Sequence, residues 1–149
     1  MINIMKLVYP AILTPCIEKE GYTIEIPDLP GCISEGKDMA DAIEMGKDAA
    51  CGWIIDELEN GNNVPQQLFP FKEPELINSK KIISLLVLNI DQYAKDHGNK
   101  SVRKNVTIPE YLNSYAAKNN VNLSKLLQEA LLNLISKKCN TKKGEQICH

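Results

Sequence analysis

The chain has 149 residues, of which 44% are hydrophobic and 24% are charged, and this length fits one medium domain or one small domain with a smaller appendage. Its longest apolar run, residues 82–90, is about half of the ~20 residues that a membrane-spanning helix requires, so the sequence predicts no membrane segment. Five cysteines without a CxxC pair argue against a disulfide framework or a zinc knuckle and predict a reducing cytoplasm.

The formal net charge of −2 conceals two unlike halves. Up to Asn99 the chain contains 8 basic and 16 acidic residues, a balance of −8. From Lys100 onward it contains 9 basic and 3 acidic residues, a balance of +6. Such asymmetry is typical of a part that meets an anion, often nucleic acid, joined to a part that meets something else.

Three short strands are predicted at the start of the chain. Residues 6–14 form the first, rather than a signal peptide, because Pro10 and Pro15 interrupt the apolar segment and no small-residue cleavage site follows. Residues 22–26 alternate between apolar and polar side chains and form a hairpin with the first strand. Residues 30–36 form a third strand after a Pro-Gly turn.

A long helix and a fourth strand complete this front part. Asp38 is the expected N-cap, Asp41 occupies the capping-box position, and apolar residues recur at helical spacing down to Gly61. Residues 62–75 contain three prolines and form a loop, after which residues 81–90 give an almost wholly apolar strand. The expected order is β-β-β-α-β.

A domain boundary is expected near Gly98, where apolar periodicity is weak. Beyond it we expect a strand at 103–108, a helix at 109–119 and a helix at 123–137, a β-α-α unit. The predicted fold class is α+β, with a front domain at 1–92, a linker at 93–101, a β-α-α domain at 102–138 and a polar, mobile tail at 139–149.

The strand at 103–108 lacks a partner in its own neighbourhood. Val106 and Ile108 share one face with the apolar stripes of the two helices, whereas Arg103, Asn105 and Thr107 share the other. A unit this short cannot bury enough surface to be stable alone, and a single strand leaves its backbone groups unpaired. The simplest solution is a two-fold dimer in which two copies of the strand pair antiparallel above four helices.

A two-stranded ribbon of this kind fits the major groove of DNA. Arg, Asn and Thr suit readout of base edges, and Asn122 would cap the second helix so that its first amides and Lys125 meet a phosphate. The plainer interpretation is that the three polar residues are the solvated face of an ordinary strand. The candidate DNA-binding residues are Arg103, Asn105, Thr107, Asn122, Ser124 and Lys125.

No catalytic or metal-binding constellation is predicted. His97 and His149 cannot assemble a metal cluster or a nucleophile-base pair, and no glycine-rich phosphate loop occurs. The first and last strands of the front domain contain no acid, although a two-metal nuclease would need carboxylates there. We therefore expect neither enzymatic activity nor a cofactor.

Two stretches resemble known families. Residues 104–135, KNVTIPEYLNSYAAKNNVNLSKLLQEALLNLI, resemble the ribbon-helix-helix domain of bacterial repressors. The front segment, with its PDLPGC turn and the helix that follows, resembles the HicB antitoxin family. The resemblance implies a partial ribonuclease H-like front domain that covers a small basic HicA-type toxin, an mRNA-cleaving enzyme, and a C-terminal domain that represses the operon by binding operator DNA as a homodimer. Higher assemblies with the toxin would tune that affinity.

Asp28 and Glu35, in and after the matching turn, are the candidate toxin-binding residues, although the plainer explanation of each is an ordinary exposed loop acid. The front domain's balance of −8 suits a basic partner. Two alternatives stay open at this point. One is a ligand-responsive repressor without a toxin partner, and the other is a metal-dependent nuclease fused to a DNA-binding tail, which the acid-poor strands disfavour.

Overall fold

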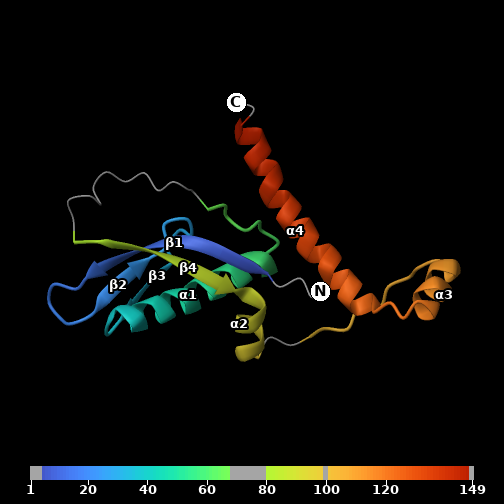
Figure 1. Cartoon of the computed structure of the whole chain (residues 1–149), viewed down its shortest axis with the longest axis horizontal. Helices are drawn as coiled ribbons and strands as arrows, with labels where there is room; N and C mark the ends of the chain where they lie inside the picture. Colours follow the sequence, from blue (N-terminus) through green and yellow to red (C-terminus); the bar gives the residue numbers. More distant parts are fainter. Residues whose placement is uncertain (1–4, 68–79, 99–100, 148–149) are drawn as a thin grey trace.

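The computed structural model describes residues 5–67, 80–98 and 101–147, with side chains described up to residue 136. Within those ranges the chain forms a mixed α+β structure of a four-stranded antiparallel sheet and four helices (Figure 1). The elements are β1 (Lys6–Pro15), β2 (Tyr22–Glu25), β3 (Ile33–Gly36), α1 (Met39–Glu59), β4 (Ile82–Asn89), α2 (Ile90–Asp96), α3 (Glu110–Lys118) and α4 (Leu123–Ile147).

The sheet has the strand order β3-β2-β1-β4, so β1 is central and β4 is an edge strand. All neighbouring strands are antiparallel, and the β1–β2 hairpin confirms the sequence prediction. The register places Ile12 of β1 opposite both Glu25 of β2 and Ile83 of β4. The predicted order β-β-β-α-β is therefore correct for this part of the chain.

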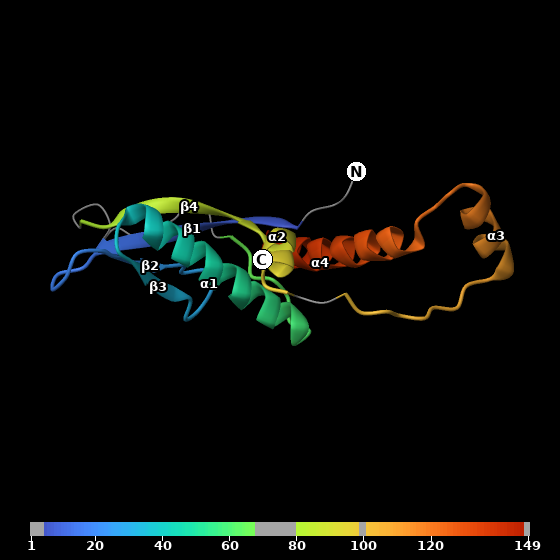
Figure 2. The same cartoon turned by 90° about the horizontal axis from the view of Figure 1, so that it is seen from below.

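The hydrophobic core lies between the sheet and α1 (Figure 2). Successive strand residues point to opposite faces, so one face of β1 and β4 supplies fully buried side chains to this layer. α1 presents small residues to the sheet, which allows a close approach. The side chains with no exposed surface include Tyr9, Ala11 and Leu13 of β1, Ile24 of β2, Ala42, Ala50 and Ile54 of α1, and Leu86 and Leu88 of β4.

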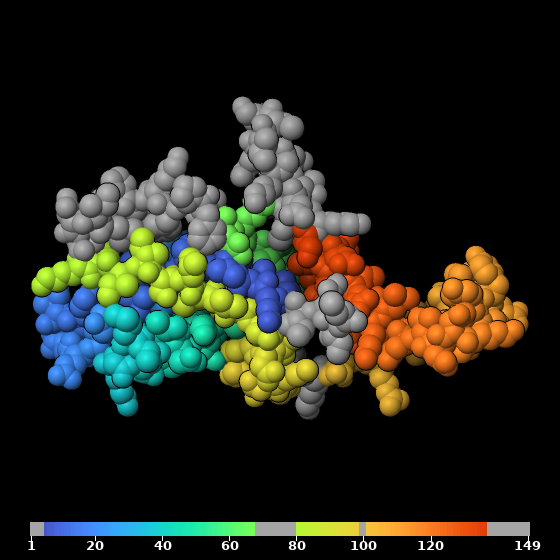
Figure 3. All heavy atoms as spheres, in the orientation of Figure 1, coloured from blue at the N-terminus to red at the C-terminus, as the bar shows by residue number. Residues whose placement is uncertain are grey.

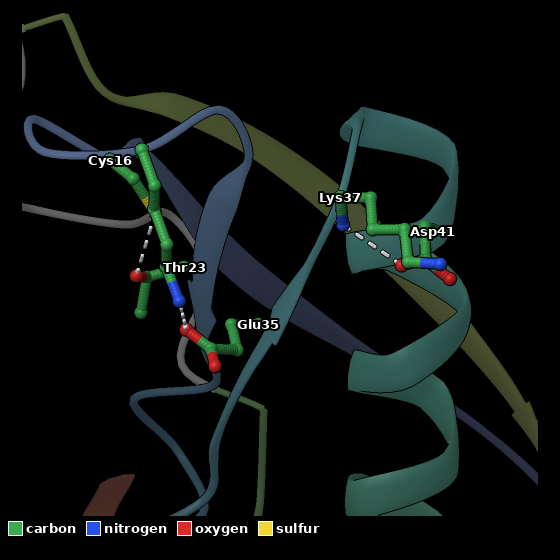
Figure 4. Close-up of polar contacts among 6 residues, drawn as sticks. Cys16, Thr23, Glu35, Lys37 and Asp41 are labelled. Carbon is green, nitrogen blue, oxygen red and sulfur yellow. Dashed lines mark hydrogen bonds and ion pairs between the residues drawn. The ribbon is translucent and has the colours of Figure 1, made fainter.

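Asp38 begins α1, as the sequence predicts. Its side chain accepts a hydrogen bond of 2.8 Å from the backbone N–H of Asp41. The Asp41 carboxylate reaches back to the backbone N–H of Lys37 at 2.9 Å, one residue before the N-cap itself (Figure 4). These two bonds satisfy amides at the helix start and fix the two-residue connection from β3 into α1.

α2 occupies part of the segment where the sequence predicts a linker. Its first turn is capped by Asn89, whose side chain accepts from the backbone N–H of Gln92 at 3.0 Å. Tyr93 packs against the core cluster and stacks on His97 with ring centroids 3.9 Å apart. His97 Nε2 lies 3.4 Å from Asp48 Oδ1 of α1. Packing against α1 therefore makes this short segment helical, although its own periodicity is weak.

The two C-terminal helices begin where the sequence predicts, but the second is longer than predicted. α3 starts after Pro109, and α4 runs from Leu123 to Ile147, so the predicted polar tail is helical in most of its length. The predicted helix end near residue 137 is wrong, because Lys, Glu and Gln are good helix formers and no proline ends the helix.

Residues 101–109 form no strand in the single chain. They lie outside the four-stranded sheet, which contains β1 to β4 only among the described residues. A strand requires a hydrogen-bonded neighbour, and the described part of this chain offers none to this segment. The predicted ribbon stays a prediction that depends on a second copy.

Candidate functional site

The segment before α3 presents its polar and apolar side chains to solvent alike. Arg103, Asn105 and Thr107 are exposed, which is what a reading surface requires. Val106 is also exposed, to 63%, and Ile108 to 37%. Residues 105–108 alternate between polar and apolar side chains, and both kinds are exposed. This segment is therefore incomplete as a folded structure.

The apolar side chains of α3 and α4 are uncovered in the same way. In α3 the buried residue is Ala116, and the larger side chains face outward. In α4 the leucines recur at spacings of three and four and form one stripe. The C-terminal apolar stripe consists of Val106, Ile108, Leu112, Tyr115, Leu123, Leu126, Leu127, Leu131 and Leu134, all of them exposed. Figure 1 shows α3 held away from the sheet, so the front domain does not cover it.

The turn between α3 and α4 has a defined geometry. Asn120 adopts a left-handed conformation with φ of 53°. The N–H of Val121 bonds to the carbonyl of Ala116 at 2.9 Å, and the N–H of Asn120 bonds to that of Ala117 at 3.4 Å. This pair of bonds is the Schellman motif, which satisfies the last carbonyls of α3 and directs the chain into α4.

Asn122 caps α4 as the sequence predicts. Its Oδ1 accepts a hydrogen bond of 3.1 Å from the backbone N–H of Lys125, and its carbonyl accepts from Leu126 at 3.0 Å. Ser124 and Lys125 are exposed beside this cap. The structure therefore groups Asn122, Ser124 and Lys125 at one helix end, where oriented backbone amides favour an anion.

Asp28 and Glu35 are not brought together. Asp28 lies in the turn before β3, whereas Glu35 lies next to the last residue of that strand. Glu35 accepts a hydrogen bond and ion pair of 3.0 Å from Lys19 in the β1–β2 hairpin, and this interaction raises the pKa of Lys19. The same hairpin brings Cys16 Sγ within 3.8 Å of Thr23 Oγ1 (Figure 4).

The PDLPGC turn is a packed structural element. Leu29 is fully buried beneath it, and its N–H bonds to the Ile26 carbonyl at 3.0 Å. Trp53 of α1 donates from Nε1 to the Pro30 carbonyl at 3.1 Å. Gly31 has φ of 80°, a conformation that favours glycine. The motif residues therefore attach this turn to α1, and Asp28 is its half-buried acid.

The face of the sheet opposite α1 contains residues that the sequence analysis missed. Ile83, Leu85 and Val87 of β4 are exposed to 46%, 58% and 54%. The sequence reads as a strand buried on both faces, because apolar residues occupy odd and even positions alike. Because β4 does not alternate between polar and apolar residues, its sequence could not show which of its faces is exposed.

Two hollows formed by described residues have charged side chains in their lining. One surrounds the β1–β2 hairpin tip and includes Glu18, Lys19, Lys37 and Asp38. Another, of about 390 Å³, lies between α2 and α4 and includes Asp91, Lys95, Lys125 and Glu129. Charged side chains therefore contribute to the lining of both hollows.

The described residues offer neither a metal-binding cluster nor a membrane-spanning helix. Among residues 5–67, 80–98 and 101–147, no group of three or more His, Cys, Asp or Glu side chains could hold a metal ion. None of the helices in this described part of the chain combines the length and hydropathy needed to cross a membrane.

Comparison with known proteins identifies the family. The family model described as the HicB-like antitoxin of bacterial toxin-antitoxin systems matches residues 9–138, which is most of the chain. The chain belongs to the HicB-like antitoxin family. An uncharacterised 14.9 kDa protein of the rep-hol intergenic region of Haemophilus phage HP1 is 30% identical over 99 residues, covering 65% of this chain and 72% of the phage protein.

Two solved structures are similar to this HicB-like chain. A chain in a toxin-antitoxin complex from Streptococcus pneumoniae is 22% identical, with a TM-score of 0.52, over 87% of this chain and 99% of that one. The antitoxin HicB of Burkholderia pseudomallei is 24% identical, with a TM-score of 0.48, over 85% and 96%. The first of these likenesses shows a shared fold.

Proposed function

We propose that this HicB-like chain is an antitoxin with two binding surfaces and no catalytic activity. Its front domain, residues 1–92, binds and occludes a small basic HicA-type toxin that cleaves mRNA. Its C-terminal domain, residues 102–138, forms a homodimer and represses the operon from operator DNA. Residues 93–101 join the two domains, and both partners place the protein in the cytoplasm.

The observation that carries this proposal is the C-terminal apolar stripe. Its side chains, from Val106 to Leu134, are exposed in one chain, and a monomer rarely leaves so large a contiguous apolar surface uncovered. A second copy would cover the stripe and pair the two extended segments at 103–108 as an antiparallel ribbon. Dimerisation would therefore bury the C-terminal apolar stripe and also give the backbone of residues 103–108 its hydrogen-bond partners.

Pairing would also create the reading surface. In the ribbon, Arg103, Asn105 and Thr107 of both copies project from the face opposite the stripe, where they fit the major groove. The capped start of α4, with Ser124 and Lys125, would contact a phosphate and set the register. This arrangement corresponds to a ribbon-helix-helix domain.

The front domain suits a toxin partner because it is acidic and because β1 and β4 contain no catalytic acids. Its balance of −8 complements a basic protein. Its β-β-β-α-β order supports a partial ribonuclease H-like fold, and β1 and β4 contain no acidic residue that could hold catalytic metals. A ribonuclease H-like scaffold without catalytic acids would act by occlusion alone.

A mobility-shift assay with the promoter fragment of the operon tests the repressor role. Arg103→Ala and Asn105→Ala are expected to abolish specific binding and to leave both the dimer and toxin neutralisation intact. Lys118→Ala removes the same charge at the end of α3 and serves as the matched control. Wild-type binding by both Arg103 and Asn105 variants would refute the assignment.

Salt supplies a second readout of the same complex. Operator affinity is expected to fall about 10³-fold or more between about 50 and about 200 mM salt, because each neutralised phosphate releases counterions. A salt-independent complex would contradict the role of Lys125 and its neighbours at the phosphates.

Co-expression tests the antitoxin role. The proposal expects a short basic reading frame beside the gene, and its product, expressed alone, should arrest growth. Co-expression with this chain should restore growth and give a complex that co-purifies. A failure of both outcomes would remove the antitoxin function and leave the repressor function standing.

A further inference from the structure

The open face of the sheet, opposite α1, exposes apolar side chains on its edge strand. Ile83, Leu85 and Val87 all point to this face, because their β1 partners Ile12, Pro10 and Val8 alternate with the core residues Tyr9, Ala11 and Leu13. α1 packs on the other face, where it contacts all four strands. In Figure 3 the atoms of β4, in yellow-green, form a band at the surface above α1.

The strand register orders the open face from apolar to acidic. One row crosses all four strands as Ile33, Glu25, Ile12 and Ile83. The next row places Glu35 opposite Thr23. Pro10 and Ile12 of β1 are themselves buried, so the exposed part of this face is apolar along β4 and carries carboxylates along β2 and β3.

An uncovered edge of this composition is unusual for a monomer. Proteins protect edge strands with charges, especially lysine, or with a covering element, because unpaired backbone and apolar side chains invite association. β4 contains no charged residue from Ile82 to Asn89. An exposed apolar strand with a polar rim is typical of a protein-protein interface.

The negative charge of the front domain indicates which kind of partner binds this face. The carboxylates of Glu25 and Glu35 and the front domain's balance of −8 disfavour nucleic acid on this face. A second copy of the chain would place two acidic rims against each other. A basic protein fits both features, since its apolar residues would cover β4 and its cations would meet the rim.

We propose that the small basic toxin docks on this open face, with Leu85 and Val87 at the centre of the contact and Glu25 at its rim. This inference rests on the antitoxin function proposed above and names the surface that performs it. Asp28 lies in the packed turn and takes no part. Glu35 contributes to the rim, where its pairing with Lys19 weakens its effect.

The double variant Leu85→Lys/Val87→Lys tests the surface in the full-length chain. Lysine is tolerated on edge strands, so the fold should persist, and two positive charges should repel a basic partner. The probe is a small basic HicA-type protein, sought as the product of a short reading frame next to the gene. Its dissociation constant, measured by calorimetry or interferometry, is expected to rise about 30-fold or more, and growth rescue should be lost.

The matched control is Ile17→Lys/Met45→Lys, which adds the same charge at exposed apolar positions in the hairpin loop and on α1. It is expected to bind the toxin within about threefold of wild type, a change of well under 1 kcal/mol. Circular dichroism and melting of each variant check the fold. Leu85→Thr/Val87→Thr, which keeps strand propensity without charge, should weaken binding in the same direction if the lysine variant fails to fold.

The outcomes separate the two levels of the proposal. If the wild-type chain does not bind the toxin, the antitoxin function itself is refuted. If the wild type binds and both the Lys and Thr variants bind equally well, the antitoxin function stands and the open face is not the docking site. If the variants change the oligomeric state of the free chain while toxin affinity is unchanged, a second copy occupies the face and the inference is overturned.

Discussion

Gly36 on β3 lies directly against the backbone of Ala42 in the first turn of α1. A Cβ at this glycine would collide with the Ala42 backbone nitrogen, so the strand and the helix meet without an intervening side chain. The two-residue connection through Lys37 and Asp38 requires this contact, and the hydrogen bonds of Asp41 hold it. Gly36 therefore determines where α1 begins relative to β3.

Gly36→Ala is expected to lower the free energy of unfolding by about 2–3 kcal/mol, because backbone cannot yield as a flexible side chain can. Urea denaturation followed by circular dichroism measures this. Ser34→Ala, on the same face of the same strand, is the control and should cost less than about 1 kcal/mol. Equal urea midpoints for the two variants would contradict the close contact between Gly36 and Ala42.

Leu127→Lys/Leu131→Lys is expected to convert the dimer to a monomer and to abolish operator binding. Both side chains belong to the C-terminal apolar stripe, and a buried unpaired ammonium in the dimer would cost several kcal/mol. Light scattering on a sizing column reports the mass. Ser136→Lys, on the opposite side of α4, is the control, and its dimer should survive. A Leu127/Leu131 variant that remains dimeric would place the interface elsewhere.

Asn120→Gly is expected to stabilise the C-terminal domain by about 0.5 kcal/mol, since glycine adopts a positive φ more readily than asparagine. Asn119→Gly should do the reverse. That residue has φ of −99°, and its Nδ2 donates to the Tyr115 carbonyl at 2.8 Å. Thermal unfolding of both variants gives the comparison, and a loss of stability in Asn120→Gly would contradict the Schellman geometry.

Burial raises the pKa of the Cys51 thiol to about 11, with a smaller contribution from the charge of Asp48. The folded state therefore keeps its proton at pH values where the unfolded thiol, with a pKa near 9, has lost it. This contribution to stability is complete below pH 9 and is lost as pH rises through the window from about 9 to about 11.

Comparison with Cys51→Ala isolates the thiol from other groups that titrate in this range. The variant is expected to lose less stability than the wild type between those pH values, by a difference on the order of 1 kcal/mol. Urea midpoints at several pH values provide the measurement. Parallel pH profiles for the two proteins would show that Cys51 is accessible to water.

Several features of the fold could be predicted from local sequence patterns. The alternation of Tyr22, Ile24 and Ile26, the cap at Asp38 and the cap at Asn122 act through residues close in sequence, so each element carries its own signal. The same holds for the polar face of residues 103–108, whose chemistry suggests base readout whether or not a partner strand is present. Charge asymmetry between the halves is likewise a property of composition alone.

Other features depend on contacts distant in sequence and could not be predicted in this way. α2 is helical because Tyr93 and His97 pack against α1, and β4 is exposed on one face because α1 covers only the other. A uniformly apolar strand contains no information about which side a helix will cover. The sequence determined the strands, helices and caps that have a local signal. Only the tertiary structure decided that residues 90–96 are helical and that Leu85 and Val87 face outward, because both depend on where α1 packs.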